Sequence, residues 1–314
     1  MLEKIVITGP LGHIGSAFIH SLSPGEFGEI LLIDSMVAQR YCSLFNLPNG
    51  VKFRFVEADI DKVDLVPLFR GAAAVIHLAA ITDAASSFEN PAEVERINLG
   101  ATQKVARACQ AVGAKMVFPS TTSVYGVQNG VVDETCSMSQ LKPQSPYADT
   151  KLRSELFLAA MNGLSFVTIR MGTIFGISPG MRFHTAVNKF IWQACVGQPL
   201  TVWRTALDQK RPYLAVNDAV RALRFLIDND LFDRRVYNIV TINATVREIV
   251  DSIRVHVPSL EVKLVDSPIM NQLSYEVSSE AIGRLGFRFD GILAQEIGAS
   301  VKLIRNASVI TAVT

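Results

Sequence analysis

Short runs of apolar, mostly β-branched residues alternate along this chain with longer segments whose apolar positions recur at helical spacing. We predict a strand at each apolar run, at residues 4–8, 30–33, 51–56, 73–78, 115–118 and 166–169. Segments such as 14–22 and 91–112 have the period of amphipathic helices. Strands that alternate with helices predict an α/β fold built on a doubly wound parallel sheet, with helices on both faces.

The rhythm changes after residue 172, where glycines and a proline interrupt the alternation. We therefore expect a larger domain at 1–170 and a smaller, mostly C-terminal α/β domain at 171–314. No internal repeat or low-complexity linker separates the two, so they are expected to interleave, with about 211–240 returning to the first domain. The elements predicted in this part are an amphipathic segment at 185–195, strands at 211–216 and 236–240, a helix at 219–227, and small helical pieces thereafter.

Composition is that of a globular protein with a substantial core, since 49% of the 314 residues are hydrophobic and 19% are charged. A formal net charge of +1 provides no electrostatic footprint for nucleic acid or an anionic membrane surface. Four widely spaced cysteines form no C-x-x-C pair and no histidine cluster accompanies them, so we expect reduced thiols and no metal. The chain opens without a signal-peptide pattern and its apolar runs are short, which predicts a cytoplasmic protein.

Three glycines, Gly9, Gly12 and Gly15, follow the first predicted strand and open the first predicted helix. This spacing permits a tight turn and close approach of the backbone to a pyrophosphate, although a merely structural turn is the alternative. Asp34 ends the second strand, where a carboxylate accepts hydrogen bonds from ribose hydroxyls and repels a 2′-phosphate. We therefore predict NAD as cofactor, with capping of the next helix as the other role open to Asp34.

Tyr147 and Lys151 lie four residues apart in a helix that Ser145-Pro146 is suited to begin. They project from one helix face, where the ammonium can favour ionisation of the phenol and make Tyr147 an acid/base. By itself such a pair is more often an exposed helix pair. Here it follows the glycine turn and a hydroxyl cluster at 120–123, which together indicate hydride chemistry on a bound nicotinamide.

In this order the motifs resemble those of the extended short-chain dehydrogenase/reductase family, in particular its nucleotide-sugar epimerase/dehydratase branch, similar to UDP-glucose 4-epimerase. The resemblance runs through most of the chain, at residues 8–15, 34, 59–60, 77–80, 98, 120–126, 147–151, 170 and 210–218. It implies a Rossmann-type sheet with a smaller interleaved C-terminal α/β substrate domain. It also implies a homodimer through the helices at 91–112 and 146–160, although packing within one chain explains the same apolar stripes.

The resemblance implies three sets of site residues. Catalysis is assigned to Thr121, Tyr147 and Lys151, with Thr122 as the competitor of Thr121 if the register differs by one residue. His77 is expected to be a satisfied strand-end histidine. Cofactor contacts are expected from Gly9, Gly12, His13, Ile14, Gly15, Asp34, Asp59, Ile60, Leu78, Ala79, Ala80, Asn98, Tyr147, Lys151 and Met171. Substrate contacts are expected from Thr82, Thr121, Thr122, Tyr147, Thr173, Arg182 and Arg211.

The implied reaction is NAD-dependent epimerisation of a nucleoside-diphosphate sugar, usually at C4. Ionised Tyr147 removes a sugar hydroxyl proton as hydride leaves the carbon, and the resulting ketone turns over and takes the hydride back on its other face. A reductase or dehydrogenase using the same residues is the nearest alternative, and a non-catalytic dinucleotide-binding protein is a third. The Asp-Glu pair of the 4,6-dehydratases is replaced by Thr122-Ser123, so a dehydratase would need another acid such as Asp83 or Glu134.

At the substrate end, Arg211 matches an arginine that contacts the nucleotide diphosphate, and Arg182 is expected to add a second phosphate contact. The alternatives are a surface ion pair for Arg211 and a solvated rim position for Arg182. Thr173 stands where a sugar-binding asparagine is usual, and no late arginine occurs around residues 271–272. The nucleobase and the sugar therefore stay open.

Overall fold

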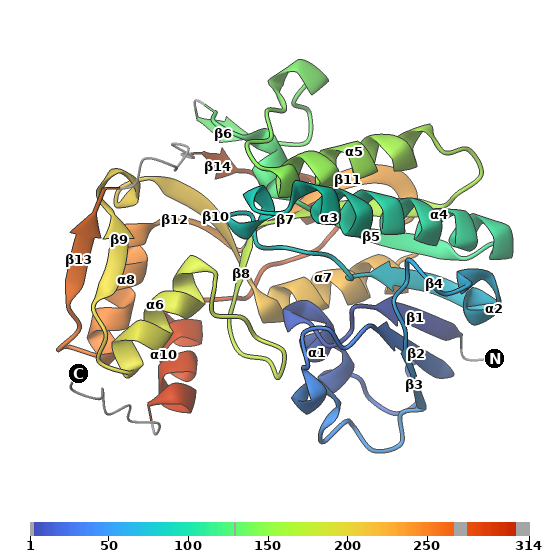
Figure 1. The fold of residues 1–314 in the computed structure, drawn as a ribbon, viewed down its shortest axis with the longest axis horizontal. Helices are drawn as coiled ribbons and strands as arrows, with labels where there is room; N and C mark the ends of the chain where they lie inside the picture. Colours follow the sequence, from blue (N-terminus) through green and yellow to red (C-terminus); the bar gives the residue numbers. More distant parts are fainter. Residues whose placement is uncertain (1–2, 129, 267–274, 306–314) are drawn as a thin grey trace.

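A computed structural model describes residues 3–128, 130–266 and 275–305. Its larger part is a seven-stranded sheet of order β11-β7-β5-β4-β1-β2-β3, in which every pairing is parallel. This confirms the predicted doubly wound sheet, shown in Figure 1. The strand bounds are β1 (Lys4–Thr8), β2 (Glu29–Asp34), β3 (Phe53–Glu57), β4 (Ala72–His77), β5 (Lys115–Thr121), β7 (Phe166–Met171) and β11 (Asp233–Ile239).

Helices cover both faces of this sheet (Figure 1). On one face α1 (His13–His20) packs against α7 (Val216–Asp228), and Phe18 and Leu223 share a core with the sheet. On the other face α2 (Leu65–Phe69), α4 (Ala101–Val112) and α5 (Pro146–Ala160) bury a second core. The strand order reverses between β1 and β4, and ligands of open α/β sheets bind outside the carboxyl ends of the strands at such a point.

The segment predicted as one helix at 91–112 is interrupted. It consists of α3 (Pro91–Val94), a π-helical turn at Glu95–Gly100 and α4. Asn98 lies on the π turn, and its side chain is hydrogen-bonded in both directions to the backbone of Ile81. A π turn inside a helix often marks a functional site. Here it allows Asn98 to fix the chain that follows β4.

The smaller part contains a three-stranded sheet of order β12-β10-β8 and a two-stranded sheet of β13 and β9. α7 and β11 join the larger sheet, whereas β10 pairs in the smaller one. The expectation of only small helical pieces after residue 240 is wrong, because three strands and three helices occur among the described residues there. The bounds are β8 (Thr173–Phe175), α6 (Ala186–Cys195), β9 (Leu200–Trp203), β10 (Lys210–Ala215), β12 (Ile242–Thr245), α8 (Val246–His256), β13 (Val262–Val265) and α10 (Leu293–Ile304).

A late segment crosses back to the larger part. β14 (Glu276–Val277) pairs with β6 (Val131–Val132), and α9 (Glu280–Arg284) follows and contacts β11. None of the described helices has the length and apolar character that crossing a lipid bilayer requires. Single 3-10 turns complete the chain at η1 (Tyr41–Leu44), η2 (Ser86–Phe88), η4 (Thr122–Tyr125), η5 (Met138–Gln140) and η6 (Arg204–Ala206).

Candidate active site

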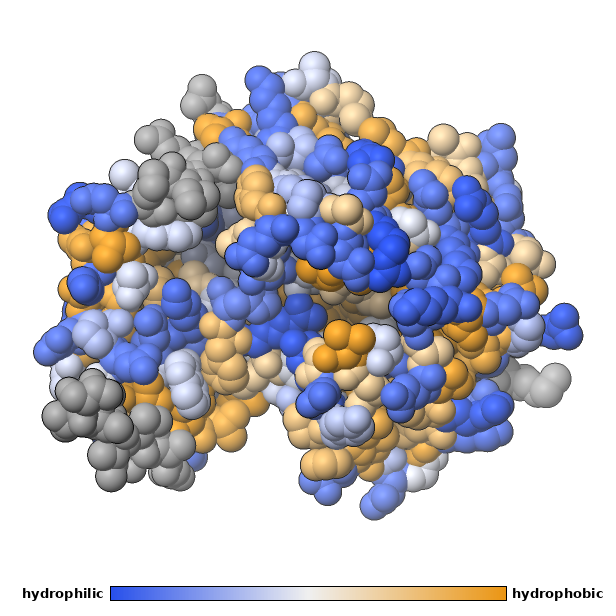
Figure 2. Space-filling view, in the orientation of Figure 1, coloured by the Kyte–Doolittle hydropathy of each residue, from blue (hydrophilic) through white to orange (hydrophobic). Residues whose placement is uncertain are grey.

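A cavity of about 820 Å³ lies between the two parts, at the carboxyl ends of the central strands. Figure 2 shows the surface hollowed between the part that carries α6 and β9 and the part that carries β1 to β3. Most of the predicted site residues share its wall: Gly9, Gly12, His13, Ile14, Gly15, Leu78, Ala80, Thr82, Thr121, Tyr147, Lys151, Met171, Thr173, Arg182 and Arg211. Six lie outside this wall: Asp34, Asp59, Ile60, Ala79, Asn98 and Thr122.

The glycine turn has the geometry that a dinucleotide needs. Gly9 has φ +69°, and a β-carbon there would lie 2.6 Å from the backbone of Ala79, so only glycine fits between β1 and the chain after β4. Gly12 precedes α1, and no side chain caps that helix. The free N–H groups of its first turn are therefore available to an anion such as a pyrophosphate. These residues fit NAD.

Asp34 binds the same turn from β2. Its carboxylate accepts the N–H of Met36 at 3.1 Å and the N–H of Leu11 at 3.4 Å. The next helical turn, η1, begins after Arg40, so Asp34 does not cap it. A carboxylate has about four acceptor positions, which leaves Asp34 free to accept further bonds from ribose hydroxyls.

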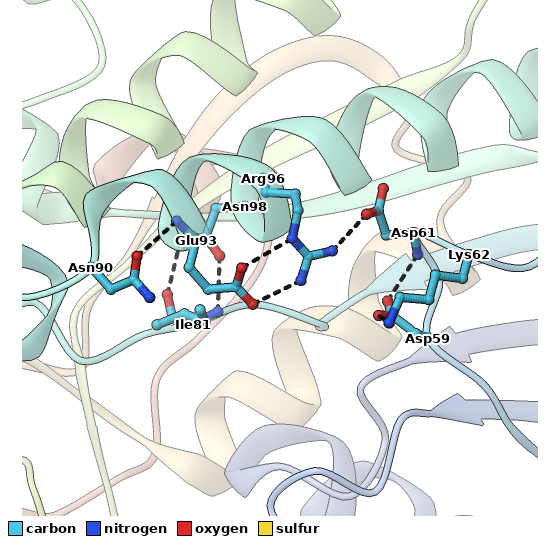
Figure 3. A network of polar contacts seen from close by, with 8 residues as sticks. All are labelled: Asp59, Asp61, Lys62, Ile81, Asn90, Glu93, Arg96 and Asn98. Atoms are coloured by element: carbon cyan, nitrogen blue, oxygen red, sulfur yellow. Dashed lines mark hydrogen bonds and ion pairs between the residues drawn. The ribbon is translucent and has the colours of Figure 1, made fainter.

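Figure 3 shows a polar network that joins the chain after β3 to the helical segment that contains the π turn. Asp59 accepts the N–H of Asp61 at 3.0 Å and pairs with Lys62 at 3.4 Å, while Ile60 is buried in the core. Arg96, from the π turn, joins the carboxylate of Asp61 to that of Glu93 (Figure 3). The network thus ties the chain after β3 to the π turn and forms the framework of the site.

Tyr147 lies in the first turn of α5, which Ser145 caps by accepting the N–H of Ala148. Its phenol is close enough to the hydroxyl of Thr121, the last residue of β5, for that hydroxyl to act on the Tyr147 pKa. Burial raises the pKa of Tyr147 above its ordinary value, while the Thr121 hydroxyl and the charge of Arg182 act in the opposite direction. The Thr122 hydroxyl instead donates to the Met171 carbonyl at 3.3 Å, so Thr121 is the threonine beside Tyr147.

Lys151 is buried one helical turn after Tyr147. Its ammonium donates to the carbonyl of Pro119 at 2.8 Å and lies 4.8 Å from the ring centre of Phe118. Burial lowers the pKa of Lys151 to about 8, against the opposing charge of Glu155. The sequence pattern indicated Lys151 as the cation that acts on Tyr147; in the structure, the charge of Arg182 opposes the burial that raises the Tyr147 pKa.

Sequence reasoning missed a buried ionic group directly behind these residues. Glu155 accepts hydrogen bonds from the hydroxyl of Ser120 and from Arg170, whose Nη2 lies 2.7 Å away. Arg170 in turn stacks 4.8 Å over the ring of Tyr125. The group joins β5, β7 and α5 where Thr121 and Lys151 are attached. Its sequence signal is that Glu155 follows Lys151 by one helical turn on the same face.

The cavity wall also carries polar atoms that have no hydrogen-bond partner among the described residues. These are Nε and Nη2 of Arg211, Nε of Arg182 and the hydroxyl of Tyr213. Buried polar groups in native proteins are almost always hydrogen-bonded, so the unpaired atoms mark where a polar ligand fits. Nη1 of Arg182 donates to the hydroxyl of Thr82, and the Tyr275 phenol bonds the hydroxyl cluster at 122–123.

Several other side chains named from the sequence have structural partners. His77 contacts the hydroxyl of Thr8 at 2.8 Å and that of Thr102 at 3.1 Å, which confirms that it is a satisfied strand-end histidine. Glu134 accepts the backbone N–H of Asn238, while Asp83 lies in the cavity wall. Positions 271–272 and 307–314 lie outside the described residues. Within the described ranges, no three histidine, cysteine or acidic side chains gather as a metal site would require.

Comparison with known proteins places these observations in a family. The model of the NAD dependent epimerase/dehydratase family matches residues 5–240. The Uncharacterized UDP-glucose epimerase YtcB of Bacillus subtilis is 31% identical over 232 residues, which are 70% of this chain and 71% of that protein. A trifunctional UDP-glucose 4,6-dehydratase, epimerase and reductase of Arabidopsis thaliana, RHM1, is 28% identical over 91% of this chain, which spans only 44% of that relative.

Two solved structures are similar over nearly the whole length. MoeE5 in complex with UDP-glucose and NAD has a TM-score of 0.82 at 26% identity, covering 96% of this chain and 99% of that one. The UDP-glucuronic acid 4-epimerase from Bacillus cereus, in complex with UDP-glucuronic acid and NAD, has a TM-score of 0.84 at 25% identity, with the same coverage. The likeness confirms the fold expected from the motifs. The chain belongs to the NAD dependent epimerase/dehydratase family.

Proposed function

We propose that this protein epimerises a nucleoside-diphosphate sugar at C4 through a transient 4-keto sugar, with NAD tightly bound throughout. The observation that carries the proposal is that Tyr147, Thr121 and Lys151 line one cavity together with the glycine turn and Arg211, and that the Thr121 hydroxyl acts on the pKa of Tyr147. Relatives with 25% identity or more include a UDP-glucose epimerase and structures that hold NAD with UDP-glucose or UDP-glucuronic acid.

In the proposed reaction Tyr147 accepts the proton of the C4 hydroxyl and later returns it. Bound NAD supplies the acceptor and donor of hydride. Thr121 donates a hydrogen bond to the reacting sugar oxygen, which keeps that oxygen within reach of Tyr147. Lys151 uses one of its three N–H groups on Pro119, so two are left to bind the ribose hydroxyls next to the nicotinamide.

At the other end we propose that Arg211 binds the diphosphate of the substrate. Its Nε and Nη2 are buried and have no partner among the described residues, and a guanidinium presents such donors in a planar fork that matches phosphate oxygens. Thr82 and Thr173 line the same cavity as Arg211 and Tyr147, and we propose that they contact the sugar. The hydroxyl of Thr122 is engaged by the Met171 carbonyl and the Tyr275 phenol, which argues against its use in an elimination.

Proton NMR in heavy water tests the reaction. The purified protein is incubated with UDP-glucose or UDP-glucuronic acid and no added NAD, and we expect the 4-epimer without deuterium on carbon. Loss of water, or deuterium beside a carbonyl, would instead indicate elimination or another epimerisation. Turnover that depends on added NAD(H) would indicate a reductase.

Tyr147→Phe tests the catalytic assignment. It removes the acid/base, so turnover is expected to fall by about 10²–10⁴-fold while NAD binding is retained. Tyr237→Phe is the matched control, because that phenol bonds Asp233 in β11 and is absent from the cavity wall. Unchanged turnover in Tyr147→Phe would contradict the assignment.

We also propose that the protein is a homodimer through the outer faces of α4 and α5. Leu156, on α5, is 43% exposed, as expected of an apolar residue that a partner helix covers. Sedimentation velocity is expected to give a dimer for the unaltered chain and a monomer for Leu156→Glu. A monomeric unaltered chain would contradict the proposal. The cytoplasmic location stays a prediction of the sequence.

A further inference from the structure

Two arginine side chains approach the glycine turn at the same point. A β-carbon built on Gly12 would lie 3.5 Å from Nη2 of Arg182 and 3.9 Å from Nη1 of Arg40. The second glycine of such a turn lacks a side chain so that the backbone can approach a pyrophosphate. Both guanidinium groups therefore reach the space reserved for the diphosphate.

The two arginines come from different parts of the molecule. Arg40 precedes η1, in the connection that follows β2, and Arg182 lies in the connection between β8 and α6. No described residue forms a hydrogen bond or an ion pair with the Arg40 guanidinium, and Nε of Arg182 is buried without a described partner. Two neighbouring cations, one of them with a buried donor that has no described partner, form a site that suits an anion.

Residues 176–182, here called the strap, lie on the glycine turn. The N–H of Gly180 donates to the hydroxyl of Ser16 at 2.8 Å, and the Ser178 hydroxyl donates to the His13 carbonyl at 2.9 Å. His13 also contacts the carbonyl of Gly176 at 2.8 Å. A β-carbon on Gly180 would come within 2.2 Å of the Leu11 carbonyl oxygen, so the two backbones touch. The strap therefore fixes Arg182 over the turn.

The connection that carries Arg40 is hydrogen-bonded to both the glycine turn and the strap. Ser43 donates its hydroxyl to the Leu11 carbonyl at 3.0 Å, and the Cys42 thiol lies 3.5 Å from the carbonyl of Pro179 in the strap. The glycine turn, the strap and this connection thus form one hydrogen-bonded unit. The guanidinium groups of Arg40 and Arg182, neither of which has an ion-pair partner among the described residues, both approach Gly12.

We infer that Arg40 and Arg182 clamp the diphosphate of NAD from its two sides, so that the strap must lift before the cofactor can leave. This rests on the proposed function, because NAD is the cofactor it requires. It changes the role expected for Arg182, which the sequence assigned to the substrate. The diphosphate carries two negative charges and meets two guanidinium groups, so the charges balance when the clamp is filled.

Electrostatics agree with this geometry. Burial and the charge of Arg40 lower the pKa of Arg182 to about 10, as expected of a cation held near another without an anion between them. The same two arginines add to the burial that lowers the pKa of His13 to about 4. The carboxylates that face Arg182 are Asp34 and Asp83, and neither forms an ion pair with it among the described contacts.

The test measures binding rather than turnover. Protein freed of NAD is titrated with ADP-ribose by calorimetry, for the unaltered chain and for Arg40→Gln, Arg182→Gln and the double variant. Each single change is expected to weaken ADP-ribose at least about 10-fold, because each removes a charged hydrogen bond. Adenosine affinity is expected to change less than about 2-fold, because the clamp contacts only phosphate. Arg54→Gln is the control, because the Arg54 side chain is 65% exposed on β3, where it pairs with Glu29 at 3.6 Å.

A second measurement separates cofactor from substrate. UDP is titrated into the NAD-loaded proteins, and its affinity is expected to stay within about 3-fold of the unaltered chain. Loss of UDP affinity in Arg182→Gln with unchanged ADP-ribose affinity would assign this arginine to the substrate and overturn the clamp. Equal ADP-ribose affinity in all variants would overturn it as well. Failure of the unaltered chain to bind ADP-ribose would reject the cofactor itself, and with it the proposed function.

The lifetime of bound NAD gives an independent readout. NAD release is followed by rapid filtration after exchange into buffer, and both arginine variants are expected to release it at least about 10-fold faster. Arg182→Lys keeps the charge without the fork and is expected to lie between Arg182→Gln and the unaltered chain. Equal release rates in all variants would contradict the inference even if equilibrium affinities fell.

Discussion

Replacing Glu155 by methionine should destabilise the protein strongly. Its carboxylate accepts three hydrogen bonds from Arg170, two of them from Nε, and one from Ser120, and the side chains of Glu155 and Arg170 are only 6% and 5% exposed. Methionine has similar volume, so the change removes the charge without opening a large cavity. Arg170 would then hold an uncompensated charge between β7 and α5.

The magnitude follows from burial. Breaking a buried ion pair on one side costs about 3–5 kcal/mol, whereas an exposed pair is worth about 0–1 kcal/mol. An unfolding entropy of about 2.1 cal/mol/K per residue gives about 0.66 kcal/mol/K for the 314 residues. The loss therefore lowers the unfolding midpoint by about 5–8 °C. Replacing both partners by methionine should recover most of that loss, because no unpaired charge is left.

An exposed ion pair with the same N–O distance is the control. Arg153 and Glu95 also lie 2.7 Å apart, but their side chains are 43% and 53% exposed. Calorimetry at pH 7 on NAD-loaded protein should show a shift below about 1.5 °C for Glu95→Met. The reasoning is refuted if Glu155→Met shifts the midpoint no more than Glu95→Met does, or if the double variant with Arg170→Met is less stable than either single one.

Three further predictions follow from individual residues. Burial lowers the pKa of Lys151 from 10.5 to about 8, so the stability of the unaltered chain should rise as pH increases between these values. Lys151→Met should lack that rise and unfold about 5 °C higher at pH 7, as thermal melts across pH would show. Burial lowers the pKa of His77 to about 3, so the imidazole stays neutral in the folded chain and takes up a proton only on unfolding. The stability of the protein should therefore fall as pH drops below 6.5. NMR shifts of the His77 ring that stay constant down to pH 4.5 would agree, whereas a titration midpoint near pH 6 would contradict the prediction. Gly9 and Gly71 have similar φ angles, +69° and +75°, but of the two only Gly9 would bring a β-carbon within 2.6 Å of backbone atoms. In urea unfolding, Gly71→Ala should therefore lower the free energy of unfolding by about 1 kcal/mol and Gly9→Ala by at least about 3 kcal/mol. Equal losses in the two variants would count against a packing role for Gly9.

The central sheet could be predicted because its signals are local. Each inner strand is a buried, mostly apolar run, and glycine at position 9 marks a turn that no other residue fits. Ser145 and Pro146 predict the start of the helix that carries Tyr147 and Lys151. These elements are determined by residues near them in the chain, so pattern and structure agree.

The short strands of the smaller part could not be found in this way. β9 and β13 are four residues each and pair across a long stretch of chain, Leu200 with Val262. Their alternation is too brief to distinguish from a loop, and the partner strand supplies the order. The π turn at Asn98 is similar, because the bond to Ile81 that accompanies it joins residues 17 positions apart.

The site shows the same division between local and distant determinants. Spacing alone put Tyr147 and Lys151 on one helix face, but it could not show that the Lys151 ammonium is engaged by Pro119 or that Glu155 meets Arg170. Nor could it show which cation acts on Tyr147. That cation is carried on a connection of the smaller part, which no spacing rule places beside α5.

This arrangement ties acid/base strength to the closed form of the site. Arg182 counteracts the burial that raises the pKa of Tyr147, and it does so from the strap that lies on the glycine turn. If the strap lifted, as the clamp requires, Tyr147 would lose the charge of Arg182, and this loss by itself would favour the protonated phenol. Because Arg182 also approaches Gly12, the movement that would free the cofactor would also take this charge away from Tyr147.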